Sequence, residues 1–296
     1  MSTQPAPRNK VTVLTLQQKK RSGEPITMLT CYDYSSAVML EQAGLDMLLV
    51  GDSLGMVVLG HENTLSVTMD DMLRHCKAVA RGAKTPFLVG DMPFMSYQVD
   101  DKEAVRNAGR LLAEGGMDAV KLEGGMEYLT TVRAIVRAGI PVMGHIGLMP
   151  QSANQVGGFK VQGRTALAAK KLLDEALALQ SAGCFAIVLE AVPSRVAELI
   201  ADRLTIPTIG IGAGADTDGQ VLVLHDMLGM FDRFTPRFVK QYAHLHQELQ
   251  SALQNYIQEV RTHQFPSGDH SFTMKEEEWQ ALLDLLDSEL QMGNEM

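Results

Sequence analysis

The chain has 296 residues, enough for two ordinary domains or for one α/β barrel with additions at its ends. Hydrophobic residues make up 46% of it and charged residues 21%, a composition that argues against extensive disorder. Its 26 basic and 35 acidic residues give a net charge of −9, and so acidic a chain is unsuited to binding nucleic acid through the phosphates.

The sequence also argues against a membrane protein, a secreted protein and a disulfide-rich protein. No apolar stretch approaches the roughly 20 residues that cross a membrane. Residues 1–10 are polar and lack the apolar core of a secretory signal. Three cysteines are too few for a disulfide framework and indicate a reducing compartment. We therefore expect a cytoplasmic protein that binds neither nucleic acid nor membrane.

One pattern repeats from residue 25 to residue 228: a short apolar run, then Gly, Asp or Pro, then a longer amphipathic stretch. Most of the short runs are apolar on both faces, as parallel strands covered by helices are. The eight predicted strands are 26–32, 47–51, 87–90, 119–122, 142–146, 185–189, 208–211 and 221–224. The clearest predicted helices are 68–81, 101–113, 127–137 and 165–180. Thr68 and Asp71 have the spacing of a capping box, which marks a helix start.

Eight strands that alternate with helices predict a (β/α)8 TIM barrel. A doubly wound open sheet is the alternative that this pattern leaves open. The connection at 213–220, between the last two strands, is too short for a full helix.

Two segments lie outside the repeated pattern. Residues 11–23 are expected to form a short helix over the bottom of the barrel, and residues 236–262 a long final helix. After a break at 266–270, apolar residues recur at helical spacing at Trp279, Leu282, Leu283, Leu286 and Leu290. The expected organisation is an N-terminal segment 1–24, a catalytic barrel 25–264 and a C-terminal tail 265–296 with an acidic amphipathic helix. The tail would pack on its own barrel or on a neighbouring subunit.

Polar side chains lie in or directly after the ends of five successive apolar runs. These residues are Asp52 and Ser53, Asp91, Lys121 and Glu123, His145, and Glu190. In a barrel they all lie at the C-terminal ends of strands, where active sites of such enzymes are built. Lys121 and Glu123 are two residues apart and therefore on the same face of their strand. His145 by itself is equally compatible with a hydrogen-bonded core histidine.

Carboxylates that converge repel one another, and a divalent cation would relieve the repulsion. Oxygen ligands without paired cysteine or histidine favour a hard ion, magnesium first and manganese second. Such an ion could hold a 2-oxo acid by two oxygens, polarise its carbonyl and stabilise an enolate. Cys31, Cys76 and Cys184 have no zinc-ligand spacing and are expected to be packing residues.

Two glycine-rich segments are candidates for contact with a substrate. The glycines of the run 210–214 would allow either close packing against the backbone or the close approach of a substrate to it. The loop 155–164 has the composition of a flexible lid.

The ordered set of motifs resembles the ketopantoate hydroxymethyltransferase family. The resemblance runs from about residue 30 to residue 272. It is carried by the segments 30–35, 50–56, 90–94, 121–125, 144–148, 158–164, 189–193 and 210–214. It implies a barrel of the phosphoenolpyruvate/pyruvate type that transfers a hydroxymethyl group from 5,10-methylenetetrahydrofolate to 3-methyl-2-oxobutanoate. The product would be 2-dehydropantoate, a precursor of pantothenate.

The resemblance also implies roles for the residues already singled out. Asp52, Asp91 and Glu123 match the family's magnesium site. Ser53 and Lys121, together with Asp52 and Asp91, match the oxo-acid site, to which His145 is added as an active-site histidine. Glu190 matches the general base that removes the C3 proton, after which the enolate attacks the methylene carbon of the folate. The family further implies a homo-oligomer, as a decamer.

Two alternatives remain at this point. A lyase or mutase acting on oxaloacetate-like or phosphonopyruvate-like substrates would keep the barrel and the metal. Its lid would often carry a nucleophilic or acidic residue, and the loop 155–164 has neither cysteine nor acid. A non-catalytic binding protein is the other alternative, which the complete set of polar strand-end residues disfavours.

Overall fold

The computed structural model describes the backbone of residues 8–152, 160–231 and 234–293, with side chains up to residue 288. The chain divides into two compact units, Met1–Ala243 and His244–Met296. The first holds the barrel. The division lies before the boundary expected at 264/265, so the last long helix of the expected barrel belongs to the second unit.

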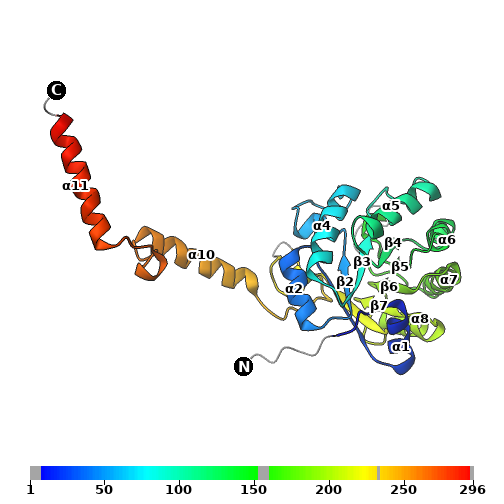
Figure 1. Ribbon diagram of the computed structural model, residues 1–296. Helices are drawn as coiled ribbons and strands as arrows, with labels where there is room; N and C mark the ends of the chain where they lie inside the picture. Colours follow the sequence, from blue (N-terminus) through cyan, green and yellow to red (C-terminus); the bar gives the residue numbers. More distant parts are fainter. Residues whose placement is uncertain (1–7, 153–159, 232–233, 294–296) are drawn as a thin grey trace. The chain divides into compact units, whose positions relative to one another are not determined.

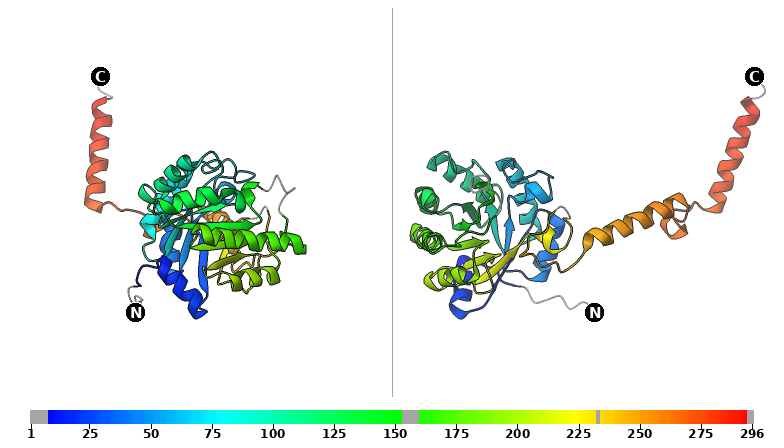
Figure 2. Two further views of the ribbon diagram at one scale, coloured as in Figure 1. Left: turned by 90° about the vertical axis from the view of Figure 1, so that its right-hand side faces the viewer. Right: turned by 180° about the vertical axis from the view of Figure 1, so that it is seen from behind.

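The first unit is a closed barrel of eight parallel strands in the order β1 to β8, with helices around it (Figures 1 and 2). The predicted TIM barrel is confirmed, and the open sheet is ruled out because β1 pairs with β8. The strands are β1 (Ile26–Thr30), β2 (Met47–Val50), β3 (Phe87–Asp91), β4 (Ala119–Glu123), β5 (Val142–Gly147), β6 (Ala186–Glu190), β7 (Thr208–Ile211) and β8 (Gly219–Leu222). Strand β8 begins and ends two residues before its predicted range.

Each of the predicted helices named above overlaps an observed one. The helices of the first unit are α1 (Val13–Ser22), α2 (Tyr34–Ala43), α3 (Leu54–Val57), α4 (Met69–Gly82), α5 (Asp101–Ala113), α6 (Leu129–Arg137), α7 (Ala166–Ala182), α8 (Ser194–Arg203) and α9 (Leu224–Met227), with a 3-10 turn η1 (Met126–Tyr128) before α6. The capping box is present, since Asp71 N donates to Thr68 Oγ1 and Thr68 N to Asp71 Oδ2. Residues 212–218, all described, contain no helix, as their length requires.

Inside the barrel, apolar residues are followed by polar residues along the inward face of β3, β4, β5 and β6. Phe87 and Val89 are followed two residues later by Asp91, and Ala119 is followed by Lys121. Because side chains alternate along a strand, these residues share the inward face. The apolar residues fill the N-terminal part of the interior, so the polar ones gather at the C-terminal end.

Helix α1 covers the N-terminal end of the barrel, as predicted. Leu16 is fully buried in the interior cluster that includes Ile26 and Phe87. Lys20 Nζ lies 2.7 Å from Asp218 Oδ2, and the same oxygen accepts a hydrogen bond from Thr208 N. The helix is therefore held by both apolar packing and charge.

We expect Leu16→Ala to lower the free energy of unfolding by about 2–5 kcal/mol, because it leaves a cavity beneath the barrel interior. Leu14 lies in the same helix and is 73% exposed, so Leu14→Ala should change stability by about 0.5 kcal/mol or less. Urea titration of both variants measures the difference. Equal stabilities would show that α1 does not close the barrel.

The second unit consists of α10 (Leu245–Arg261), a 3-10 turn η3 (Gly268–His270) and α11 (Glu276–Gly293). The predicted start of the long helix at residue 236 is wrong. Val239 N bonds Pro236 O and Tyr242 N bonds Met227 O, so residues 236–242 form a turn tied to α9. The tail helix is confirmed as α11, although the side chain of Leu290 lies outside the described residues. No helix in the described ranges is long and apolar enough to cross a membrane.

Candidate active site

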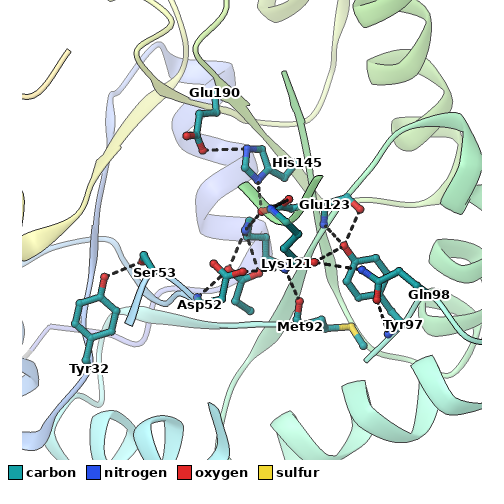
Figure 3. Close-up of polar contacts among 12 residues, drawn as sticks. Tyr32, Asp52, Ser53, Met92, Tyr97, Gln98, Lys121, Glu123, His145 and Glu190 are labelled. Atoms are coloured by element: carbon teal, nitrogen blue, oxygen red, sulfur yellow. Dashed lines mark hydrogen bonds and ion pairs between the residues drawn. The ribbon is translucent and has the colours of Figure 1, made fainter. Parts of the chain in front are cut away.

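Strand register brings the predicted site residues side by side. Asp91 on β3 is paired with Lys121 on β4, and Glu123 on β4 is paired with His145 on β5. Paired positions of neighbouring parallel strands point to the same face, so these side chains meet inside the barrel mouth. Figure 3 shows Lys121, Glu123 and His145 close together there.

A buried ion pair lies at the centre of this group. Lys121 Nζ is 3.0 and 2.9 Å from the two carboxylate oxygens of Asp91, whose Oδ2 also accepts a hydrogen bond from Asp52 N. Burial raises the pKa of Asp91 to about 7; Lys121 opposes the shift, and the negative charge of Asp52 adds to it. Burial alone would lower the pKa of Lys121, but the surrounding carboxylates raise it, so the lysine is cationic.

The side chain of His145 lies between those of Glu123 and Glu190, close to both but without a hydrogen bond to either. Glu123 Oε1 lies 3.8 Å from His145 Nδ1, and His145 Nε2 lies 3.3 Å from Glu190 Oε2. Neither contact has hydrogen-bond geometry, so Glu123 Oε1 and both ring nitrogens are buried without a hydrogen-bond partner among the described residues. Burial lowers the pKa of His145, helped by Lys121, and keeps the ring neutral. Buried polar atoms without partners indicate a place for a ligand.

Burial also raises the pKa of Glu123 well above its ordinary value, and the charges of Asp52, Asp91 and Glu190 act in the same direction. Lys121 Nζ, 3.8 Å from Glu123 Oε1, opposes them. The site therefore concentrates more negative charge than its lysine compensates.

Two residues that sequence reasoning missed hold the carboxylates in place. Gln151 Nε2 donates to Asp52 Oδ2 at 2.9 Å, and Gln151 N donates to Glu123 Oε2 at 3.0 Å. Tyr97 OH lies 3.0 Å from both Glu123 O and Gln151 Oε1, and Figure 3 shows the tyrosine beside Glu123. Both side chains are buried. They reach the site from loops after β3 and β5, and no spacing in the sequence marks them.

Ser53 occupies the other side of the group. Its Oγ lies 2.8 Å from Tyr32 OH, which is buried in the barrel wall. The hydroxyl of Ser53 is thus held at the wall of the site by a fixed tyrosine (Figure 3).

All seven predicted site residues line one cavity of about 410 Å³. Lys160 and Val161, from the predicted lid, also line it, whereas residues 155–159 of that loop lie outside the described part of the chain. The cavity has the size and the buried polar groups expected of a small-molecule site.

The three cysteines are packing residues, as predicted. Cys31, Cys76 and Cys184 are free thiols in the core between strands and helices. Burial raises the pKa of Cys31 and of Cys184 to about 12, so these two sulfurs are uncharged.

Comparison with known proteins identifies the family. The family description that matches residues 10–268 is ketopantoate hydroxymethyltransferase. The 3-methyl-2-oxobutanoate hydroxymethyltransferase of Syntrophomonas wolfei is 58% identical over 268 residues, which cover 90% of this chain and 97% of that one. The enzyme of the same name from Syntrophus aciditrophicus is 56% identical, with 92% and 100% covered.

Solved structures support the same barrel. Phosphonopyruvate hydrolase in complex with oxalate and Mg²⁺ is similar with a TM-score of 0.59 at 12% identity, over 97% of this chain and 98% of that chain. A 2,3-dimethylmalate lyase of the PEP mutase/isocitrate lyase superfamily gives 0.57 at 16% identity, over 98% and 99%. At such low identities the likeness concerns the fold alone. The extended, high-identity match to the first group shows that the chain belongs to the ketopantoate hydroxymethyltransferase family.

Proposed function

We propose that the chain transfers a hydroxymethyl group from 5,10-methylenetetrahydrofolate to 3-methyl-2-oxobutanoate, through the enolate of the oxo acid. The observation that carries the proposal is the group of Asp52, Asp91 and Glu123 around Lys121 in one cavity, with Glu190 at its edge. The names of the relatives favour this reaction over the lyase or mutase alternative. The cytoplasmic location and the homodecamer stay predictions.

The donor set suits a hard cation such as Mg²⁺. Asp52, Asp91 and Glu123 offer oxygen ligands, and Glu123 Oε1 is buried without a hydrogen-bond partner among the described residues. In the described part of the chain, no three His, Cys, Asp or Glu side chains are already arranged to bind a metal ion. We propose that these three carboxylates hold the ion together with oxygens of the substrate. The ion would polarise the keto group and stabilise the enolate.

The protein's own residues would handle the proton and the charge. Glu190, 15% exposed at the cavity wall, would remove the proton from C3 of the oxo acid. Lys121 would place positive charge near the developing enolate oxygen. His145, neutral and 3.3 Å from Glu190 Oε2, would orient that carboxylate.

The transfer then balances with one molecule of water. The C3 carbanion forms a carbon–carbon bond to the one-carbon unit, and both bonds from this unit to folate nitrogens break. One nitrogen takes up the proton removed from C3, and the other takes a proton from water. The hydroxyl of that water completes the hydroxymethyl group, so the products are 2-dehydropantoate and tetrahydrofolate.

Deuterium exchange at C3 of 3-methyl-2-oxobutanoate tests the proposal. In D₂O with Mg²⁺ and no folate, the protein should catalyse exchange, and EDTA should stop it. Added 5,10-methylenetetrahydrofolate should then give 2-dehydropantoate. Absence of both exchange and product would refute the proposed function.

Gln151 should be required for tight cation binding, since it fixes Asp52 and Glu123 at once. We expect Gln151→Ala to weaken Mg²⁺ or Mn²⁺ binding about 10–100-fold, the usual effect of losing a residue that orients metal ligands. Isothermal titration calorimetry measures this without turnover. Gln162, whose side chain donates to Lys160 O and has no other hydrogen bond among the described residues, provides the control variant Gln162→Ala. Equal affinities of both variants would show that Gln151 does not position the ligands.

A further inference from the structure

The cavity extends beyond the carboxylate group to a second, largely apolar region that the proposed chemistry of the oxo acid does not use. Its wall comes from the ends of β7 and β8, from α9 and from the segment that follows α9. Residues that line it include Ile211, Val223, Asp226, Phe231, Phe234 and Phe238. A small oxo acid held by Lys121 and the carboxylates would leave this region for another ligand.

One aromatic ring of this region, that of Phe238, packs directly against the backbone after β7. Gly212, after β7, has a φ of +64°, and a Cβ placed there would come within 2.7 Å of Phe238 Cδ1. The ring of Phe238 therefore rests directly on the backbone of the glycine run 210–214. Close packing, one of the two roles considered for this run, is what the structure shows at Gly212. Phe234 is 65% exposed although it lines the cavity, so its ring is available to a ligand.

Asp226 is the acidic residue of this region. Helix α9 is fixed to the end of β1, because Leu224 N donates a hydrogen bond to the buried Thr30 Oγ1. Asp226 is only 9% exposed, and its carboxylate has no hydrogen bond or ion pair with any residue that the structure describes. Burial raises its pKa to about 6. A buried carboxylate without a partner is costly, and a ligand with N–H donors would offset this cost.

Cationic side chains lie at the edge of the same cavity. Lys160 and Arg237 both line it, both are exposed, and neither forms an ion pair within the described ranges. They would suit the carboxylates of a ligand that extends out of the cavity.

These features match the chemistry of a reduced folate. Its pterin is a flat double ring that can stack on aromatic side chains. The aminopyrimidinone edge of the pterin presents neighbouring N–H donors, which a single carboxylate can accept side by side. The glutamate end of the molecule is anionic. Because the one-carbon unit is attached beside the pterin, that ring must lie in the same cavity as the oxo acid.

We propose that Asp226 and the phenylalanines Phe231, Phe234 and Phe238 form the binding site for the pterin ring of the folate cosubstrate. Asp226 accepts hydrogen bonds from the aminopyrimidinone edge, and Lys160 and Arg237 face the glutamate carboxylates. The inference rests on the proposed function, because it is this function that calls for a folate.

Binding of tetrahydrofolate to the full-length protein tests the site directly. Asp226→Asn keeps the shape of the side chain and removes one acceptor and the charge, so the dissociation constant should rise roughly ten- to a hundredfold. Asp216 is exposed and does not line the cavity, so Asp216→Asn is the matched control and should bind as the wild type does. Titration calorimetry gives the constants, and thermal unfolding checks that each variant is folded.

A second variant keeps the test decisive if Asp226→Asn fails to fold. Phe234→Ala alters an exposed side chain, and it should weaken tetrahydrofolate binding roughly two- to tenfold. In steady-state assays both variants should raise KM for the folate more than KM for the oxo acid. Unchanged tetrahydrofolate affinity in both variants would overturn the pterin site. Failure of the wild type to bind tetrahydrofolate at all would instead overturn the proposed function.

Discussion

Glu190→Gln should abolish measurable deuterium exchange at C3 of 3-methyl-2-oxobutanoate, a loss of about 10²–10⁴-fold for removal of a general base. The amide has the shape of the carboxylate but cannot take up the proton. Binding of the oxo acid should persist, because Lys121, Ser53 and Asp91 remain in place. Proton NMR in D₂O follows the exchange, and calorimetry follows the binding.

The matched control for this experiment is Glu198→Gln. Glu198 lies on α8, is exposed and does not line the cavity, so its variant should exchange at the wild-type rate. If Glu190→Gln still exchanged the C3 proton at that rate, another group would have to be the base.

Lys121→Met should have the largest effect on stability. The substitution removes a buried cation that lies against two carboxylates and leaves them uncompensated. Breaking a buried pair in this way costs about 3–5 kcal/mol. Urea unfolding in metal-free buffer at pH 8 measures the loss, and exchange at C3 should be lost as well.

The stability loss of Lys121→Met should also depend on pH. The pKa of Asp91 is raised on folding to about 7, and removal of the lysine, which opposes that shift, raises it further. A carboxyl with a raised pKa is neutral in the folded protein below that pKa. The destabilisation should therefore be smaller at pH 5 and grow as the pH rises through 7.

Lys170 offers a control of the same residue type. It pairs with Asp174 on the surface of α7 and is 64% exposed, so Lys170→Met should cost at most about 1 kcal/mol at either pH. A Lys121→Met protein as stable as this control at pH 8 would mean that the carboxylates do not depend on the lysine.

The barrel could be predicted because its signals are local. Most of the strands are apolar on both faces. On β3 to β6 the inward face also carries a polar residue two positions after an apolar core residue, as with Val89 and Asp91. Predictions failed where tertiary contacts override the local pattern. The helix expected from residue 236 begins instead at Leu245, because backbone hydrogen bonds tie the preceding segment to α9.

The residues of the site that lie at strand ends could also be predicted from the sequence, whereas those on loops could not. Asp52, Asp91, Lys121, Glu123, His145 and Glu190 could be named from the sequence, because parallel strands of a barrel end at one rim. Gln151 and Tyr97 could not, since buried neutral side chains on loops have no characteristic spacing.

The sequence by itself determined the number and order of the strands, the side of the barrel where the acidic residues gather, and the family. Only the tertiary structure decided which groups touch. Strand register paired Asp91 with Lys121, and loop paths brought Gln151 to Asp52 and Phe238 onto Gly212. The reason is physical: periodicity records which face of an element is buried, whereas contacts between distant segments depend on how the whole chain closes.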